Sequence, residues 1–169
     1  EVFNALGRAY YYSGRYRDAI EVLKQAVDAN ENFVEAIYTA GLCQYQLKEY
    51  ERALKEFDKA SEILKEWDRL VGRVEELTKK EERRTLSPKE QRDKQHAKED
   101  LAEKYSRASE FAIDLGLRPA LNIATGDAAD ANKEWARART AYRHALVLNE
   151  GGNPADPLPH ARIGRTLLH

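Results

Sequence analysis

The sequence has little of what most secreted, membrane-embedded or disulfide-bonded chains depend on. Its single cysteine, Cys43, excludes an internal disulfide and fits a reducing compartment, so we favour a cytoplasmic location. No apolar run approaches the roughly 20 residues that a bilayer-spanning helix needs. The formal net charge of -1 gives no global field toward nucleic acid or a membrane surface. These absences leave a globular chain, and its Ala, Leu, Glu, Lys and Arg content favours helix throughout.

The sequence also has no arrangement of residues that is typical of a catalytic, phosphate-binding or metal-binding site. The glycines are singletons rather than a phosphate-binding loop, and no Ser or Cys has a nucleophile signature. None of the four histidines is spaced with a second ligand in a metal-binding pattern; they are His96, His144, His160 and His169. We therefore predict no catalytic residue, no cofactor and no metal site.

Residues 1–64 contain one pattern twice. Gly7 and Gly41 are 34 residues apart, and the same separation relates Tyr16 to Tyr50, Ala19 to Ala53, and Ala26 to Ala60. A fixed period of this length indicates a stacked repeat. We expect each unit to be two helices that cross closely at the glycine, where a side chain would push them apart.

This pattern resembles the tetratricopeptide repeat family, whose first helix carries Leu-Gly and Tyr, here Leu6, Gly7 and Tyr10. Small alanines open and close the second helix, here Ala19 and Ala26. The resemblance implies an all-α, right-handed solenoid of helical hairpins. It also implies a non-catalytic scaffold that binds a protein or peptide.

The resemblance implies a concave groove lined by the first helix of each repeat. The groove positions carried over are Asn4, Arg8, Tyr11, Tyr12, Tyr38, Leu42, Tyr45, Gln46, Ile123, Asp127 and Asp130. Tyrosine gives stiff contact area with one polar end, which suits protein recognition. Alternatively, some of these rings pack against the next helix. One subclass of the family grips a chaperone's C-terminal carboxylate with Lys and Asn; Arg8 and Thr39 replace two of those residues, so we predict no such clamp.

Residues 65–117 depart from the repeat and predict an inserted antiparallel coiled hairpin. One heptad pattern runs from Ala60 to Leu77 and a second from Leu101 to Leu115, with Ser87 placed to cap the returning helix and Glu90 to complete a capping box. We expect Leu77 near Leu101, Leu70 near Tyr105 and Ile63 near Ala112, with one returning helix that ends at Gly116.

Charged residues dominate 78–100, which predicts a solvated and frayed tip. The basic run at 79–84 is balanced by its own glutamates and has no aromatic residue to stack on bases, so nucleic acid is a disfavoured partner. A protein-docking role for the tip stays open.

Residues 118–150 repeat the pattern a third time. The matching positions are Gly126, Trp135, Ala138, Tyr142 and Ala145. Asn122 and Ala129 replace residues that are aromatic in the family, so we expect a weakly packed first helix. Residues 151–169 then predict a linker and the first helix of a truncated fourth repeat, with Gly164 at the glycine position and Ile163 and Leu167 on a bare face.

We expect a protein-binding scaffold, cut from a longer repeat protein. Two alternatives stay open: a module that forms homo-oligomers through the solenoid ends, and an accessory or regulatory domain of a larger enzyme or complex.

Overall fold

The computed structural model describes residues 2–105, 117–149, 162 and 166, and within them the fold is all-α, without strands. The helices are α1 (Val2–Tyr12), α2 (Tyr16–Ala29), α3 (Val34–Gln46), α4 (Tyr50–Arg83), α5 (Pro88–Lys104), α7 (Arg118–Ala131) and α8 (Trp135–Asn149). Among these residues, no helix combines the length and apolar character that a membrane span requires.

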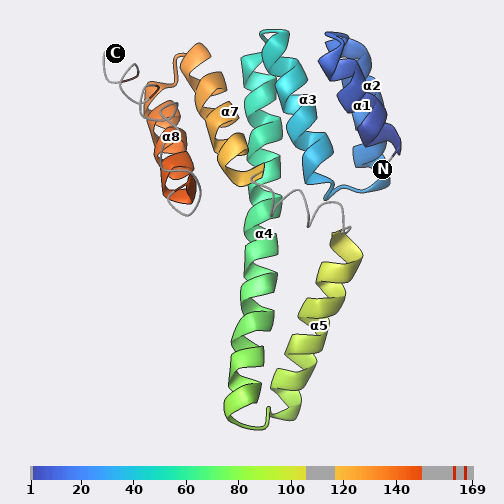
Figure 1. Cartoon of the computed structure of the whole chain (residues 1–169), viewed down its shortest axis with the longest axis vertical. Helices are drawn as coiled ribbons and strands as arrows, with labels where there is room; N and C mark the ends of the chain where they lie inside the picture. Colours follow the sequence, from blue (N-terminus) through green and yellow to red (C-terminus); the bar gives the residue numbers. More distant parts are fainter. Residues whose placement is uncertain (1, 106–116, 150–161, 163–165, 167–169) are drawn as a thin grey trace.

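Three helix pairs stand side by side in Figure 1: α1 with α2, α3 with α4, and α7 with α8. The second helix of each pair packs on the first helix of the next, because α2 contacts α3 and α4 contacts α7. The glycine-bearing helices also touch in sequence, α1 against α3 and α3 against α7. The described helices therefore stack as a helical-hairpin solenoid, as the sequence predicts.

The close crossing of each pair is centred on its glycine. A Cβ atom added to Gly7 would lie 2.5 Å from Leu23 Cγ, and one added to Gly41 would lie 2.5 Å from Phe57 Cε1. A Cβ added to Gly126 would collide with the ring of Tyr142. The predicted steric role of the glycines is therefore confirmed in all three pairs.

The turn inside each pair has the same backbone conformation. Gly14, Lys48 and Lys133 occupy equivalent positions, with φ values of 76°, 62° and 64°. Each of these amides donates to the carbonyl oxygen three residues earlier, at 3.0, 2.9 and 3.0 Å. The sequence indicates this left-handed turn only at Gly14, because glycine adopts it without steric strain.

The expectation of a weakly packed α7 is wrong. This helix buries Leu121, Ala124, Gly126, Ala128 and Ala129. Small side chains let α7 approach its neighbours closely, so an aromatic residue is not needed to fill the space. Most of these residues join one core cluster with buried residues of α3, α4 and α8, which makes the second and third pairs a continuous core.

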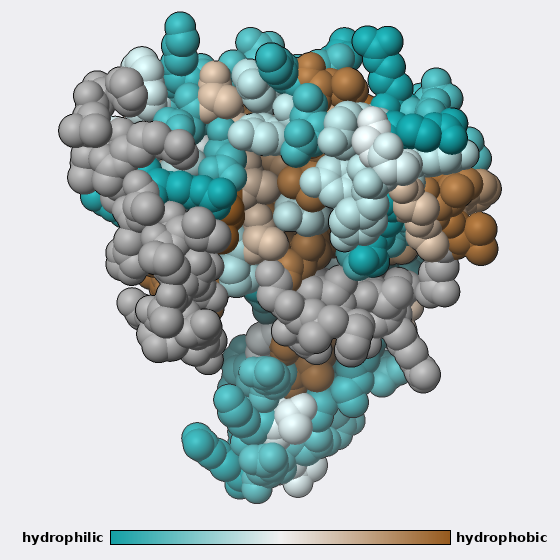
Figure 2. All heavy atoms as spheres, turned by 45° about the horizontal axis from the view of Figure 1, so that its top comes forward, coloured by the Kyte–Doolittle hydropathy of each residue, from teal (hydrophilic) through white to brown (hydrophobic). Residues whose placement is uncertain are grey.

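Helix α4 is 34 residues long and continues past the solenoid, and α5 returns beside it (Figure 1). Ser87 and Glu90 form the predicted capping box: Ser87 Oγ accepts from the Glu90 amide at 3.3 Å, and the Glu90 carboxylate accepts from the Ser87 amide at 2.9 Å. The tip is hydrophilic outside (Figure 2), but it is not frayed, because Leu77 and Leu86 are buried beneath the charged surface.

The expected register of this hairpin is wrong at its far end. Arg73 on α4 pairs with Asp93 on α5 at 3.1 Å, and Leu77 lies one turn nearer the tip than Arg73. Leu101 lies two turns of α5 away from Asp93 in the opposite direction. It packs instead in the cluster that contains Leu70.

Helix α5 also ends earlier than expected, at Lys104 rather than near Gly116. Tyr105 takes an extended conformation, and its ring meets Trp67 edge-on at 4.8 Å between centroids. Its hydroxyl donates to the Ile63 carbonyl oxygen at 3.1 Å. The expected contact of Leu70 with the Tyr105 cluster is present, whereas Ala112 lies outside the described residues.

A glycine-to-alanine comparison tests the crossing geometry. We expect Gly41→Ala to lower the free energy of unfolding by about 1–3 kcal/mol, because the new methyl group would overlap the buried Phe57 ring. Gly72→Ala is the matched control: it is exposed within α4 and has open space, so it should raise stability by about 0.5–1 kcal/mol. Urea denaturation measures both, and equal effects would contradict the steric role.

Candidate protein-binding face

The predicted groove residues lie on the row of first helices, α1, α3 and α7. Asn4 and Arg8 of α1 both reach Glu35 of α3: Asn4 Nδ2 donates to Glu35 Oε2 at 3.2 Å, and Arg8 Nη1 lies 3.8 Å from Glu35 Oε1. Asn4 is buried, whereas Arg8 is exposed. The structure therefore gives Asn4 a role in joining the first two pairs and leaves Arg8 accessible.

The tyrosines of this face are mostly half-buried, and neighbouring rings hold them in place. Tyr11 lies 5.4 Å from Tyr12 and 5.8 Å from Tyr16 between ring centroids. Tyr38 lies 6.0 Å from Phe57, which joins it to the core. Only Tyr12 is largely free, with 75% of its surface exposed. The predicted tyrosines therefore do not separate into exposed groove residues and buried core residues. Most of these rings are partly packed and partly exposed.

The second pair contributes a half-buried aromatic and aliphatic strip. Tyr45 packs 5.6 Å from Tyr50, and Leu42 lies against the same core cluster as Tyr45. Gln46, at the end of α3, is exposed. These positions present part of each side chain to solvent while the rest is fixed by packing.

Charges and rings from three helices converge around Tyr38. Burial raises the pKa of Tyr38 to about 12, and the nearby Tyr11, Tyr12 and Asp127 add to the rise. Burial likewise raises the pKa of Tyr11. Side chains of α1 and α7 therefore lie close enough to α3 to influence the pKa of one of its tyrosines.

Asp127 is engaged within the molecule. Its Oδ1 accepts from the Tyr142 hydroxyl at 2.8 Å and lies 3.1 Å from Arg162 Nε. Burial and this hydrogen bond to Asp127 raise the pKa of the Tyr142 phenol. Of the expected fourth-repeat helix, only Arg162 and Thr166 lie within the described residues, and the carbonyl oxygen of Thr166 accepts from Arg139 at 2.9 Å. The expected bare face at Ile163 and Leu167 lies outside them.

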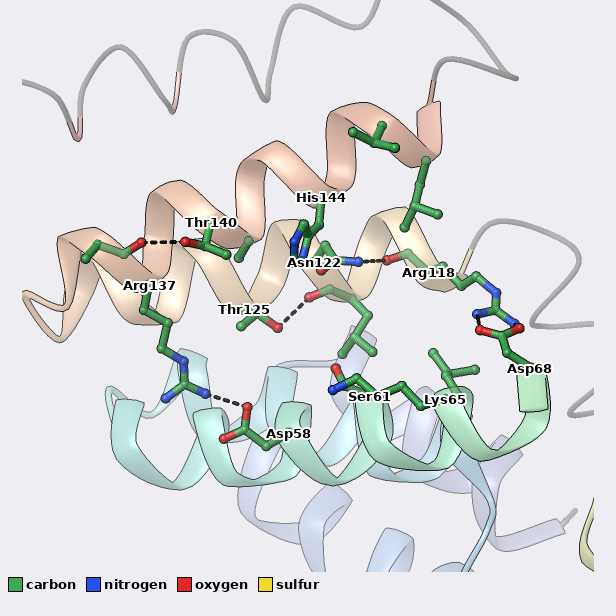
Figure 3. A pocket seen from close by; sticks show the side chains of 16 residues that line it. Asp58, Ser61, Lys65, Asp68, Arg118, Asn122, Thr125, Arg137, Thr140 and His144 are labelled. Atoms are coloured by element: carbon green, nitrogen blue, oxygen red, sulfur yellow. Dashed lines mark hydrogen bonds and ion pairs between the residues drawn. The ribbon is translucent and has the colours of Figure 1, made fainter. Parts of the chain in front are cut away.

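A hollow that the sequence does not predict lies between α4 and α8, with α7 as its floor. We call it the α4–α8 groove; its volume is about 740 Å³. Figure 3 shows Arg137 of α8 reaching Asp58 of α4, and Arg118 of α7 reaching Asp68 of α4. The feature of the sequence that could have indicated this groove is the low number of charged residues on one face of α8, which is compared with α4 below.

Within the described residues, no cluster of His, Cys, Asp and Glu could hold a metal ion. Cys43 is fully buried, and burial raises the pKa of its thiol to about 11. A neutral, enclosed thiol is a poor nucleophile, so its role is packing between α2 and α3.

Comparison with known families identifies the family of the first two helix pairs. The family model described as tetratricopeptide repeat matches residues 4–63. Residues 4–63 belong to the tetratricopeptide repeat family. No curated protein matches the chain. Tetratricopeptide repeats generally mediate protein–protein interaction and are typically non-catalytic, which agrees with the helical solenoid that α1 to α4 begin.

The raised pKa of Tyr38 predicts a loss of stability in alkali. Because the fold favours the neutral phenol, its contribution is complete below the ordinary pKa of 10.0 and disappears as pH rises through about 12. Urea denaturation from pH 8 to 12 should show a fall that Tyr38→Phe reduces by about 2–3 kcal/mol. Parallel curves for the two proteins would contradict the burial of this hydroxyl.

Proposed function

We propose that the chain is a protein-interaction scaffold that binds a peptide or helix on the tyrosine-rich face of α1, α3 and α7. The observation that carries this proposal is the exposed pair Arg8 and Tyr12 on α1, beside tyrosines that neighbouring rings already hold in place. A partner that binds fixed rings loses little side-chain entropy on binding. The half-buried rings would supply the platform, and Arg8 and Tyr12 the exposed contacts.

We further propose that α7 and α8 form a third repeat. The same glycine-to-ring crossing and the same left-handed turn support it, as does the stacking of α7 on α4. The binding face would then extend over three first helices, and α4–α5 would be a hairpin inserted between the second and third repeats. Asp127, already bound to Tyr142 and Arg162, would border this face rather than contact the partner directly.

The binding face can be tested without disturbing the core. Arg8→Ala combined with Tyr12→Ala removes two exposed side chains, so melting should be unchanged while specific partners are lost in affinity capture from the native source. Arg17→Ala, exposed on α2, is the matched control and should retain the partners. Capture of the same proteins by all three forms would contradict this face.

A second candidate, pairing between copies, is favoured by the exposed surface of α1. Val2, Phe3 and Leu6 are 77%, 42% and 41% exposed. Their equivalents one repeat later, Ala36, Ile37 and Ala40, are buried, and α2 packs on that helix. Figure 2 shows apolar side chains gathered on the α1 side of the molecule. The α1 surface therefore has the character of a face that stacks on another helix.

Light scattering over a range of concentrations tests this candidate. If copies pair through α1, the mass should rise with concentration, and Leu6→Glu should abolish the rise because it introduces a charge into the apolar contact. Lys24→Glu, exposed on α2, should behave as the unmodified chain does. A constant monomer mass at every concentration would rule out self-pairing and leave the tyrosine-rich face as the proposed function.

A further inference from the structure

The α4–α8 groove has a largely apolar floor between two ion pairs. Leu64, Leu121 and Ala141 line it from the three helices. Arg137 Nη2 lies 2.5 Å from Asp58 Oδ1 at one end. At the other end, the guanidinium of Arg118 makes two bonds to Asp68, at 2.6 and 2.7 Å. The stretch from Asp58 to Asp68 spans about 15 Å of α4.

Helix α4, the second helix of the preceding pair, provides a comparison for this surface. Residues of α8 that line the groove are Ala136, Arg137, Thr140, Ala141, His144, Val147 and Leu148. At the equivalent positions of α4, counted from the left-handed turn of each pair, the side chains are Glu51, Arg52, Lys55, Glu56, Lys59, Glu62 and Ile63. Six of these seven are Asp, Glu, Lys or Arg in α4, whereas Arg137, which pairs with Asp58, is the one such residue among the seven in α8. The α8 wall of the groove therefore carries much less charge than the corresponding surface of α4.

Three polar side chains of the groove have partners in their own helices. Thr125 Oγ1 donates to the Leu121 carbonyl oxygen at 2.8 Å, and Thr140 Oγ1 donates to that of Ala136 at 3.0 Å. Asn122 Nδ2 donates to the carbonyl oxygen of Arg118 at 2.9 Å. These bonds reduce the number of donors that α7 and α8 offer to the backbone carbonyl groups of an extended peptide. A helix satisfies its own backbone and needs only an apolar surface.

Among the residues that line the groove, Lys65 carries the charge that has no partner. Asp58 and Asp68 are neutralised by the two arginines, whereas Lys65 is exposed and has no hydrogen-bond or ion-pair partner among the described residues. Figure 3 shows Lys65 on α4 and His144 on α8, on the two walls of the groove. A carboxylate of a bound helix would therefore meet complementary charge on the α4 wall.

We propose that the α4–α8 groove binds an amphipathic α-helix of a partner protein, with an aliphatic stripe on the exposed α8 side chains Ala136, Val147 and Leu148 and acidic side chains toward Lys65 on the α4 wall. Val147 and Leu148 are 65% and 44% exposed, whereas Leu64, Leu121 and Ala141 form the buried floor beneath them. This site is separate from the tyrosine-rich face, so the chain would hold two partners, or two segments of one, at the same time.

Peptide display on the full chain tests the proposal. One library presents single helices with a randomised face, and the other presents unstructured linear peptides of the same length. The selection should enrich helical peptides that carry aliphatic residues at positions i, i+3, i+4 and i+7, flanked by Asp or Glu. Val147→Glu with Leu148→Glu should weaken them by roughly tenfold or more, whereas Arg8→Ala with Tyr12→Ala should leave their affinity unchanged.

A charge exchange makes the test specific. Lys65→Glu should weaken acidic helices by roughly 2- to 5-fold and restore binding when the peptide's acids are replaced with Lys, as measured by fluorescence anisotropy at low salt. The proposal is overturned if no helical binder responds to the α8 substitutions, if linear peptides alone depend on them, or if the charge exchange has no effect. Because Arg8 and Tyr12 are kept as controls, the outcome is independent of the tyrosine-rich face.

Discussion

In each helix pair, a residue without a side chain faces a bulky one sixteen positions later. Leu23, Phe57 and Tyr142 lie over Gly7, Gly41 and Gly126, with almost no exposed surface. The distance between the two helix axes is set at this contact, and the angle of the next pair follows from it. Tightly packed interiors do not adapt continuously to added volume, so the same contact repeated along the chain gives the same stacking geometry.

The α4–α5 projection does not interrupt the stacking of the helix pairs. Helix α4 ends at Arg83 and α7 does not begin until Arg118, yet α7 packs on α4 and contacts α3. The core continues through Leu64, Leu121 and Tyr142 as one cluster. The chain leaves along α4 and resumes the solenoid against the same helix, so α4 belongs to both the solenoid and the hairpin.

The solenoid was predictable from the sequence because steric requirements are local and periodic. Gly, Ala and ring positions recur at a fixed spacing, and each has one physical reason. The turns at Lys48 and Lys133 were less visible, since lysine has no preference for a left-handed backbone and is held there by amide hydrogen bonds on either side of the turn. The hairpin register was harder still, because the apolar residues of its two helices are sparse and their spacing alone allows more than one alignment. In the structure, Arg73 is paired with Asp93.

The two candidate sites also differ in how much of them could be predicted from the sequence. Position within the repeat predicts that the tyrosines share one face, but it does not say which rings are held by neighbours and which are free. That depends on partners such as Tyr16, Phe57 and Tyr50 from the second helices. The α4–α8 groove depends on three elements distant in sequence. Its signal becomes visible only when α8 is compared with α4 residue by residue.

The continuity of α4 has a mechanical consequence. One unbroken helix runs from the solenoid core to the hairpin tip, and α-helices are stiff over this length. Near the hairpin base, Asp68 anchors the rod to Arg118, and Lys104 lies 3.9 Å from Glu66. Because no break separates the two parts of α4, the direction in which the hairpin projects from the first helix pairs is set by a single helix axis.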